Sequence, residues 1–225
     1  FTGVANLTIV TPSRWLADEV KQSFLKDYPV QVIPNGVDQT IFRPTENDLR
    51  KKLGLEHSFV ILGVANVWER RKGLSYFCGL AKKLPEDCKI ILIGLNEKQI
   101  RELPEEIIGI TRTENAEELA GYYSMADVFV NATLEDNFPT TNLEALSCGT
   151  PVITFETGGS PESLDKTCGR VVRKGDAEAL LQAIFAEREH PMRKEDCLTR
   201  AVQYEKNDRF MEYAALYHRL WGQGE

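Results

Sequence analysis

The sequence FVILGVANVWERRKGLSYFCGLAKKLPEDCKIILI spans residues 59–93 and contains two apolar runs separated by a basic loop and a helical segment. The runs, Phe59 to Ala65 and Lys89 to Ile93, are rich in β-branched and aliphatic residues, which favours strands. The segment between them, Leu74 to Leu84, is predicted to be a helix. Strands that are apolar along nearly their whole length are typical of a parallel sheet, which is buried on both faces.

The same alternation continues beyond residue 93. Further strands are predicted at 107–110, 128–131, 152–155 and 170–172. Further helices are predicted at 97–103, 116–125, 140–147, 177–188, 194–204 and 208–221. Strand and helix in regular alternation predict an α/β fold with a Rossmann-like, doubly wound parallel sheet.

The first 58 residues are less regular. A strand at 7–10 is followed by a predicted helix that ends near Lys26, with Thr11 as its cap and Pro12 at its first position. A second strand at 30–33 precedes Asn35-Gly36, which predicts a tight turn with positive φ. A short helix is expected at 46–53. Because the chain begins at Phe1, close to a strand, we expect it to start within a fold whose earlier part is missing.

Composition narrows the classes of function. A chain of 225 residues with 42% hydrophobic residues buries one substantial core, and its net charge of -7 argues against a nucleic-acid backbone binder. Its five cysteines have no CxxC spacing, which indicates reduced thiols and a cytosolic setting. The three histidines lie far apart, so zinc sites and histidine-dependent nucleophilic sites gain no support. We see no signal peptide and no apolar run of about 18 residues, so we expect no transmembrane span.

Ligands of doubly wound sheets bind beyond the carboxyl ends of the strands. The loop after the strand at 59–65 contains Arg70-Arg71-Lys72-Gly73, where cations suit a diphosphate and glycine permits close approach of the backbone. A basic loop is also a common solvated surface feature. Both interpretations stay open on composition alone.

A second loop, residues 134–142, follows the strand at 128–131 and leads into a helix, whose free N-terminal amides attract anions. Asp136 lies in this loop and Glu144 on the helix, eight residues apart, which suits two separate contacts along an extended ligand. The alternative is a capping acid and a solvated glutamate. A third loop contains Gly158-Gly159, which predicts either a sharp turn beside a ligand or a plain turn.

Several segments, in this order, resemble the family 4 glycosyltransferases, which have the GT-B fold. The resemblance covers roughly residues 6–222. The first two matching segments are Val32-Ile33-Pro34-Asn35-Gly36-Val37-Asp38, followed by Phe42, and Arg70-Arg71-Lys72-Gly73. The other two are residues 120–128 and Asp136 to Ile153, which ends in Leu146-Ser147-Cys148-Gly149-Thr150-Pro151-Val152-Ile153. The chain is therefore identified as resembling the C-terminal, donor-binding half of a retaining enzyme of this family.

The resemblance implies roles for the matching residues. Lys72, with Arg70 or Arg71, would bind the donor diphosphate. Asp136 would contact donor-sugar hydroxyls and Glu144 the ribose, and these two are the implied catalytic residues. The donor-sugar loop would comprise Asn137, Phe138, Thr140 and Thr141, and the base-binding loop would comprise Arg112 and Thr113.

Two departures from the family pattern concern the sugar end of the site. Asp136 stands where the family more often has glutamate, and the adjacent Glu135 is an alternative. Asn137-Phe138-Pro139 replaces Gly-Phe-Gly, and Pro139 has no N–H to donate. The family needs no metal and no cofactor beyond its nucleotide-sugar substrate, so we expect none.

The resemblance also implies a division of the chain. Residues 1–28 would be a remnant of an N-terminal acceptor-binding domain and its linker, residues 29–206 the nucleotide-sugar-binding domain, and residues 207–225 a helix that packs back toward the N-terminal domain. The expected partners are a UDP- or GDP-hexose and a glycan or lipid-linked acceptor held by the missing domain. We expect a cytoplasmic protein in polysaccharide biosynthesis, compatible with peripheral attachment to the inner membrane face.

The implied reaction is retaining transfer of a hexose, which the chain alone is not expected to perform. The alternative is a nucleotide-binding or interaction module without catalysis. A dinucleotide oxidoreductase is disfavoured because no G-x-G-x-x-G follows an early strand.

Overall fold

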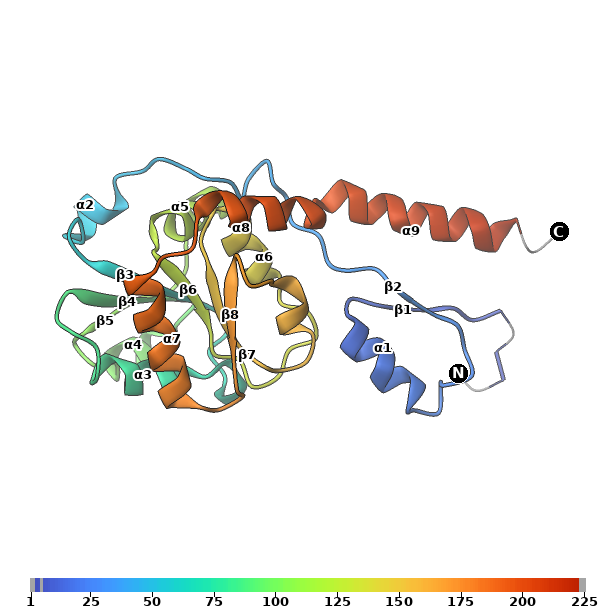
Figure 1. Cartoon of the computed structure of the whole chain (residues 1–225), viewed down its shortest axis with the longest axis horizontal. Coiled ribbons are helices and arrows are strands. Elements are labelled where there is room, and N and C mark those ends of the chain that lie inside the picture. Colours follow the sequence, from blue (N-terminus) through green and yellow to red (C-terminus); the bar gives the residue numbers. More distant parts are fainter. Residues whose placement is uncertain (1–2, 5, 223–225) are drawn as a thin grey trace.

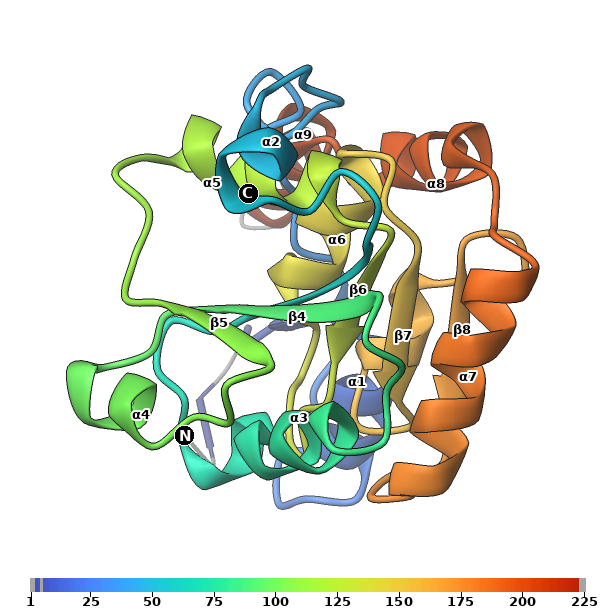
Figure 2. The same cartoon turned by 90° about the vertical axis from the view of Figure 1, so that its left-hand side faces the viewer.

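A computed structural model describes residues 3–4 and 6–222, and its main feature is a six-stranded parallel sheet (Figures 1 and 2). The strand order is β5-β4-β3-β6-β7-β8, with every neighbouring pair parallel. The strands are β3 (Phe59–Val64), β4 (Cys88–Ile93), β5 (Ile107–Ile110), β6 (Val128–Asn131), β7 (Val152–Phe155) and β8 (Gly169–Val172). The predicted doubly wound α/β fold is thus confirmed, with each strand within one residue of its predicted bounds.

Helices cover both faces of this sheet (Figure 2). One layer contains α2 (Leu49–Leu53), α5 (Ala116–Met125), α6 (Thr140–Ser147) and α8 (Lys194–Ala201). The other contains α3 (Leu74–Ala81), α4 (Glu97–Arg101) and α7 (Ala177–Glu189). The central strands are buried almost completely because both layers pack on them: Ile61 and Leu62 are each 0% exposed and point into opposite core clusters.

A small unit at the N-terminal end lies beside the main sheet (Figure 1). It consists of β1 (Ile9–Thr11), α1 (Arg14–Lys21) and β2 (Val30–Val32), and the two strands pair in parallel. The predicted helix start was wrong: Thr11 belongs to β1, and the extended Ser13 caps α1 by accepting a hydrogen bond from the backbone N–H of Leu16. The helix also ends at Lys21, before the predicted Lys26, and the Ser23 backbone N–H and hydroxyl then both donate to the carbonyl of Val20.

The segment after β2 crosses to the main sheet and does not form the predicted tight turn. Gly36 has no positive φ; its role is steric. A Cβ on Gly36 would lie 2.6 Å from the Cα of Lys206, so this segment passes directly against the first turn of the last helix. The same crossing is fixed by two backbone hydrogen bonds: the N–H of Val37 donates to the carbonyl of Tyr204, and the N–H of Lys206 donates to the carbonyl of Val37.

The last helix, α9 (Lys206–Trp221), extends away from the sheet and along the N-terminal unit (Figure 1). Lys206 forms an ion pair with Asp38, and this hydrogen bond lowers the pKa of the Asp38 carboxyl to about 2. Leu216 is buried, whereas the apolar residues Phe210, Met211, Tyr217, Leu220 and Trp221 are exposed. Residues 1–2, 5 and 223–225, which belong to the predicted terminal segments, lie outside the described residues.

Candidate functional site

The loops that follow β3 and β6 lie next to each other at the point where the strand order of the sheet reverses. From β3 the chain proceeds to β4 and β5, whereas β6 leads to β7 and β8 on the other side. A pocket of about 520 Å³ opens between these two loops. It is lined by Val64, Ala65, Asn66, Val67, Glu69, Arg71, Lys72, Asp136, Phe138, Pro139, Thr140 and Thr141. Its position is the one at which doubly wound sheets bind ligands.

Glycine allows the two loops to touch. Gly73 has φ +78°, and a Cβ there would lie 2.1 Å from the carbonyl oxygen of Ala132. The N–H of Leu134 also donates to the carbonyl of Arg71 at 2.7 Å. The close approach expected of Gly73 is therefore made to the neighbouring loop.

The two loops are also joined by charge. Lys72 Nζ donates to Asp136 Oδ2 at 2.8 Å, and their side chains are only 22% and 18% exposed. An ammonium group has three N–H donors, of which this bond uses one. Two residues predicted from separate loops thus form one partly buried ion pair in the pocket wall.

The residues left open as alternatives beside this pair differ in their position relative to the pocket. Arg71 lines the pocket, where its guanidinium bonds the Glu69 carboxylate at 3.2 Å and the Glu135 carbonyl at 3.3 Å. Arg70 is exposed and is not among the lining residues. Asp136, and not Glu135, contributes its side chain to the wall.

The N-terminus of α6 faces the same pocket. Pro139 is its N-cap residue, and no side chain caps this helix end. Thr140 and Thr141 follow and line the pocket, so the positive end of the helix dipole is directed at it. Asn137 is exposed. The missing N–H of Pro139 matters little here, because the donors at a helix N-terminus come from the residues after the cap.

Phe138 lines the pocket and also packs in the core. The residue is 4% exposed, and its ring lies 5.7 Å, centroid to centroid, from that of Tyr204, in a cluster with Val37 and Leu143. The side chain of Asn35 donates to the Phe138 carbonyl at 2.9 Å. The Pro-Asn-Gly motif therefore supports the backbone of the loop at 136–139.

Glu144 lies on α6, one turn after Thr140, and does not line the pocket. Its carboxylate accepts a hydrogen bond from the buried hydroxyl of Tyr123 at 2.9 Å. Burial raises the pKa of the Glu144 carboxyl, and hydrogen bonds from Tyr123 and Thr140 oppose that rise. Glu144 is not the fully solvated glutamate of the alternative reading, because it is only partly exposed and its carboxylate is hydrogen-bonded to the Tyr123 hydroxyl.

The predicted base-binding residues lie apart from this pocket. Arg112 and Thr113 follow β5, at the edge of the sheet, and line a separate pocket with Thr111 and Glu114. The carboxyl ends of β3 and β5 are separated by β4, so no lining residue is shared.

A buried polar network below the pocket was not predicted. Asn142 on α6 accepts a hydrogen bond from Asn131 at 2.9 Å and donates to the hydroxyls of Ser160 and Ser163 at 3.0 and 3.1 Å. Thr154 of β7 bonds Ser160 at 2.7 Å. Polar residues within predicted apolar strands, such as Thr154, were the only signal of this network in the sequence.

Comparison with known proteins gives the family. The family model described as "Glycosyl transferases group 1" matches residues 58–186, more than half of the chain and all of the pocket. The chain belongs to the group 1 glycosyltransferases.

Relatives and solved structures agree with this family. The D-inositol 3-phosphate glycosyltransferase of Corynebacterium jeikeium is 29% identical over 183 residues, covering 72% of this chain and 43% of its own. Sucrose-phosphate synthase from Thermosynechococcus elongatus has a TM-score of 0.85 at 23% identity, over 96% of this chain and 59% of its own. Anabaena HepE in complex with UDP-glucose has a TM-score of 0.81 at 18% identity, over 94% and 64%.

These structural neighbours show the fold, which is that of GT-B glycosyltransferases. The chain spans about half the length of the curated relatives that it matches. None of the helices formed by residues 3–4 and 6–222 is both long and apolar enough to cross a membrane. The same residues contain no cluster of three or more His, Cys, Asp or Glu side chains placed to hold a metal ion.

Proposed function

We propose that this chain is the donor-binding domain of a retaining glycosyltransferase that transfers a hexose from a UDP- or GDP-sugar to a glycan or lipid-linked acceptor. The observation that carries the proposal is the pocket at the switch point, where Lys72, Arg71 and the uncapped end of α6 converge. Cations and a helix N-terminus are the groups that bind a diphosphate. HepE, a structural neighbour, is a protein solved with UDP-glucose.

In the proposed complex the diphosphate lies against Lys72, Arg71 and the amides of Thr140 and Thr141. These groups would stabilise the negative charge that develops on the leaving diphosphate as the glycosidic bond breaks. Asp136 would accept hydrogen bonds from sugar hydroxyls, and its ion pair with Lys72 supports a role beside the diphosphate. Glu144 is proposed to contact the ribose through Thr140, its hydrogen-bond partner at the pocket wall.

Other parts of the proposal concern the whole protein. The acceptor would be bound by a domain of which residues 1–28 are the end, and the exposed apolar face of α9 would pack on that domain. We propose catalysis without a metal, on the cytoplasmic side of the cell, in polysaccharide assembly. Arg112 and Thr113 would contact the base only if the ligand extends across the end of β4.

Titration of the chain with UDP and with GDP by calorimetry tests the donor site. We expect binding of one of the two, and Lys72→Ala to weaken it about 10- to 100-fold, the value of one or two charge-assisted hydrogen bonds. Lys166→Ala, at an exposed position outside the pocket, is the matched control and should bind as the unmodified chain does. If neither nucleotide binds, the donor-site proposal is wrong.

The competing function is a nucleotide-binding or interaction module without catalysis. Asp136→Asn distinguishes the two, because it removes the carboxylate charge and leaves the diphosphate cations in place. We expect it to lower sugar transfer by the complete enzyme and to leave nucleotide affinity unchanged or higher. Unchanged transfer would favour the binding module.

A further inference from the structure

The N-terminus of α1 is capped by a residue of the main domain. Glu162 Oε2 accepts a hydrogen bond from the backbone N–H of Arg14, and Oε1 accepts one from that of Trp15, both at 2.8 Å. Glu162 is separated from these residues by nearly 150 positions of sequence. One carboxylate thus bridges the N-terminal unit and the main sheet.

This carboxylate completes the hydrogen bonding of the helix end. The first amides of a helix have no partner within it. In α1 the third is bonded by the cap residue Ser13, and the first two are bonded by Glu162. The first turn of α1 has no acidic residue of its own, so Glu162 also supplies the negative charge that favours a helix N-terminus.

The segment that carries Glu162 is wedged between α1 and the pocket. A Cβ on Gly159 would lie 2.0 Å from the carbonyl oxygen of Asn137 on one side and 2.4 Å from the Cβ of Ser13 on the other. A Cβ on Gly158 would lie 1.8 Å from the carbonyl oxygen of Asp136. The glycine pair therefore lies directly against the backbone of the pocket loop.

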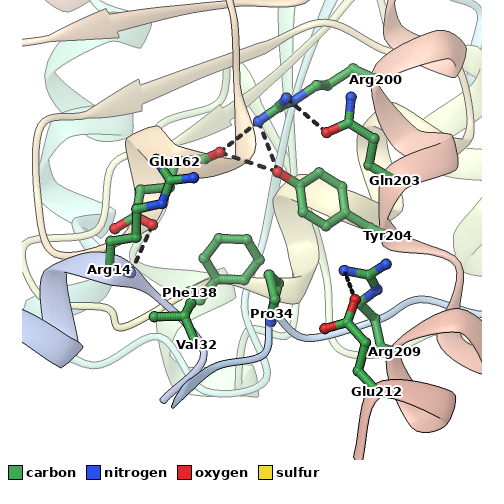
Figure 3. Close-up of a pocket in the computed structure, with 10 residues that line it drawn as sticks. All are labelled: Arg14, Val32, Pro34, Phe138, Glu162, Arg200, Gln203, Tyr204, Arg209 and Glu212. Atoms are coloured by element: carbon green, nitrogen blue, oxygen red, sulfur yellow. Dashed lines mark hydrogen bonds and ion pairs between the residues drawn. The ribbon is translucent and has the colours of Figure 1, made fainter. Parts of the chain in front are cut away.

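Glu162 is also fixed in place by hydrogen bonds within the main domain (Figure 3). It lies in the 3-10 helix η2 (Ser160–Ser163), whose two serines are hydrogen-bonded to Asn142 of α6. Its carbonyl oxygen accepts hydrogen bonds from Arg200 at 2.7 Å and from the Tyr204 hydroxyl at 3.1 Å. The cap of α1 is thus continuous with the helix whose N-terminus faces the pocket.

We propose that Glu162 is a positioning residue that fixes the N-terminal unit against the pocket loop at 136–139. Through this unit it would also position the acceptor-binding domain, of which residues 1–28 would form the end. Glu162 is not among the residues that line the donor pocket. Its proposed role is to set the distance between the acceptor-binding domain and that pocket. The proposal rests on the proposed function, since it concerns the alignment of acceptor with donor.

Amide hydrogen exchange on the chain tests the contact, with Glu162→Ala and Glu162→Gln as variants. We expect the amides of Arg14 and Trp15 to exchange at least 10-fold faster in Glu162→Ala. Glu162→Gln should be intermediate, because its single oxygen accepts one of the two bonds. Glu156→Ala, an exposed glutamate just before the same loop, is the matched control and should leave both amides unchanged. Unchanged exchange in Glu162→Ala would overturn the proposal.

Kinetics of the complete enzyme test the consequence. We expect Glu162→Ala to lower kcat at least 10-fold, Glu162→Gln to recover part of it, and the nucleotide affinity of both to stay within about 2-fold. Unchanged kcat would overturn the positioning role, as would a loss confined to donor affinity. Failure of the unmodified chain to bind UDP or GDP would instead overturn the donor site, and the exchange of the two amides would still decide the capping contact.

Discussion

At Glu144, burial and hydrogen bonding act in opposite directions on one carboxyl group. Burial raises its pKa, and the bonds from Tyr123 and Thr140 lower it, with burial the larger effect. The folded protein therefore holds the proton of Glu144 more tightly than the unfolded chain does. Between the ordinary glutamate pKa and the raised one, the native state binds more protons, so stability falls as pH rises.

Glu144→Gln is expected to remove this loss. The amide does not titrate, and its oxygen accepts the Tyr123 hydrogen bond as the carboxylate does. The variant should gain free energy of unfolding relative to the unmodified chain as pH rises above the ordinary glutamate pKa, measured by urea denaturation. Glu156→Gln, the same substitution at an exposed position, is the matched control. A flat or falling difference for Glu144→Gln would contradict the assigned cause.

Single residues of the pocket were predictable to different degrees. Lys72, Asp136, Thr140 and Thr141 line it: the first two lie in loops between a buried strand and the next helix, and the last two begin α6. That Arg71 lines the pocket and Arg70 does not could be seen only in the structure, since both are equally basic in sequence.

Among the elements, the segment Pro34-Asn35-Gly36 was predicted to be a tight turn, whereas in the structure it is part of the extended connection from β2 to the main sheet. Asn-Gly favours positive φ, but Gly36 is instead selected by contact with the first turn of α9. At this position tertiary packing, and not the local turn propensity of Asn-Gly, determines the backbone conformation.

Gly36→Ala is therefore expected to destabilise the chain by about 1–3 kcal/mol, the usual cost of overpacking. The opposing atom is backbone, at 2.6 Å from the new Cβ, and cannot turn aside as a flexible side chain does. Gly79→Ala, within α3 and with no atom within 4 Å of its Cβ, is the control and should stabilise by about 0.5–1 kcal/mol. Urea denaturation measures both, and equal signs would contradict the packing explanation.

For the molecule as a whole, the two faces of α9 differ. Leu216 is 2% exposed, whereas Phe210 and Tyr217 are 63% and 65% exposed. The exposed residues line a groove of about 680 Å³ with Pro34 and Thr140, next to the proposed donor pocket. We expect this face to be covered by the acceptor-binding domain in the complete protein.

Replacing Phe210 and Tyr217 by serine should change the stability of this chain by less than about 0.5 kcal/mol each, since both are at the surface. Leu216→Ala should cost about 2–5 kcal/mol in the same chain, as a buried leucine does. In the complete protein the two serine variants are expected to be destabilising, as measured by thermal denaturation. If they are neutral there as well, the exposed face of α9 is not an interdomain surface.

The sequence by itself determined the alternation of strands and helices, the parallel sheet and the loops that carry Lys72 and Asp136. These features depend on local periodicity and on apolar runs that are visible within a few residues of each other. Only the tertiary structure decided that the loops after β3 and β6 are neighbours, that Glu144 is hydrogen-bonded to Tyr123, and that Glu162 caps a helix nearly 150 residues earlier. Contacts between groups so far apart leave no periodic trace in the sequence, because they depend on the order in which the strands pack.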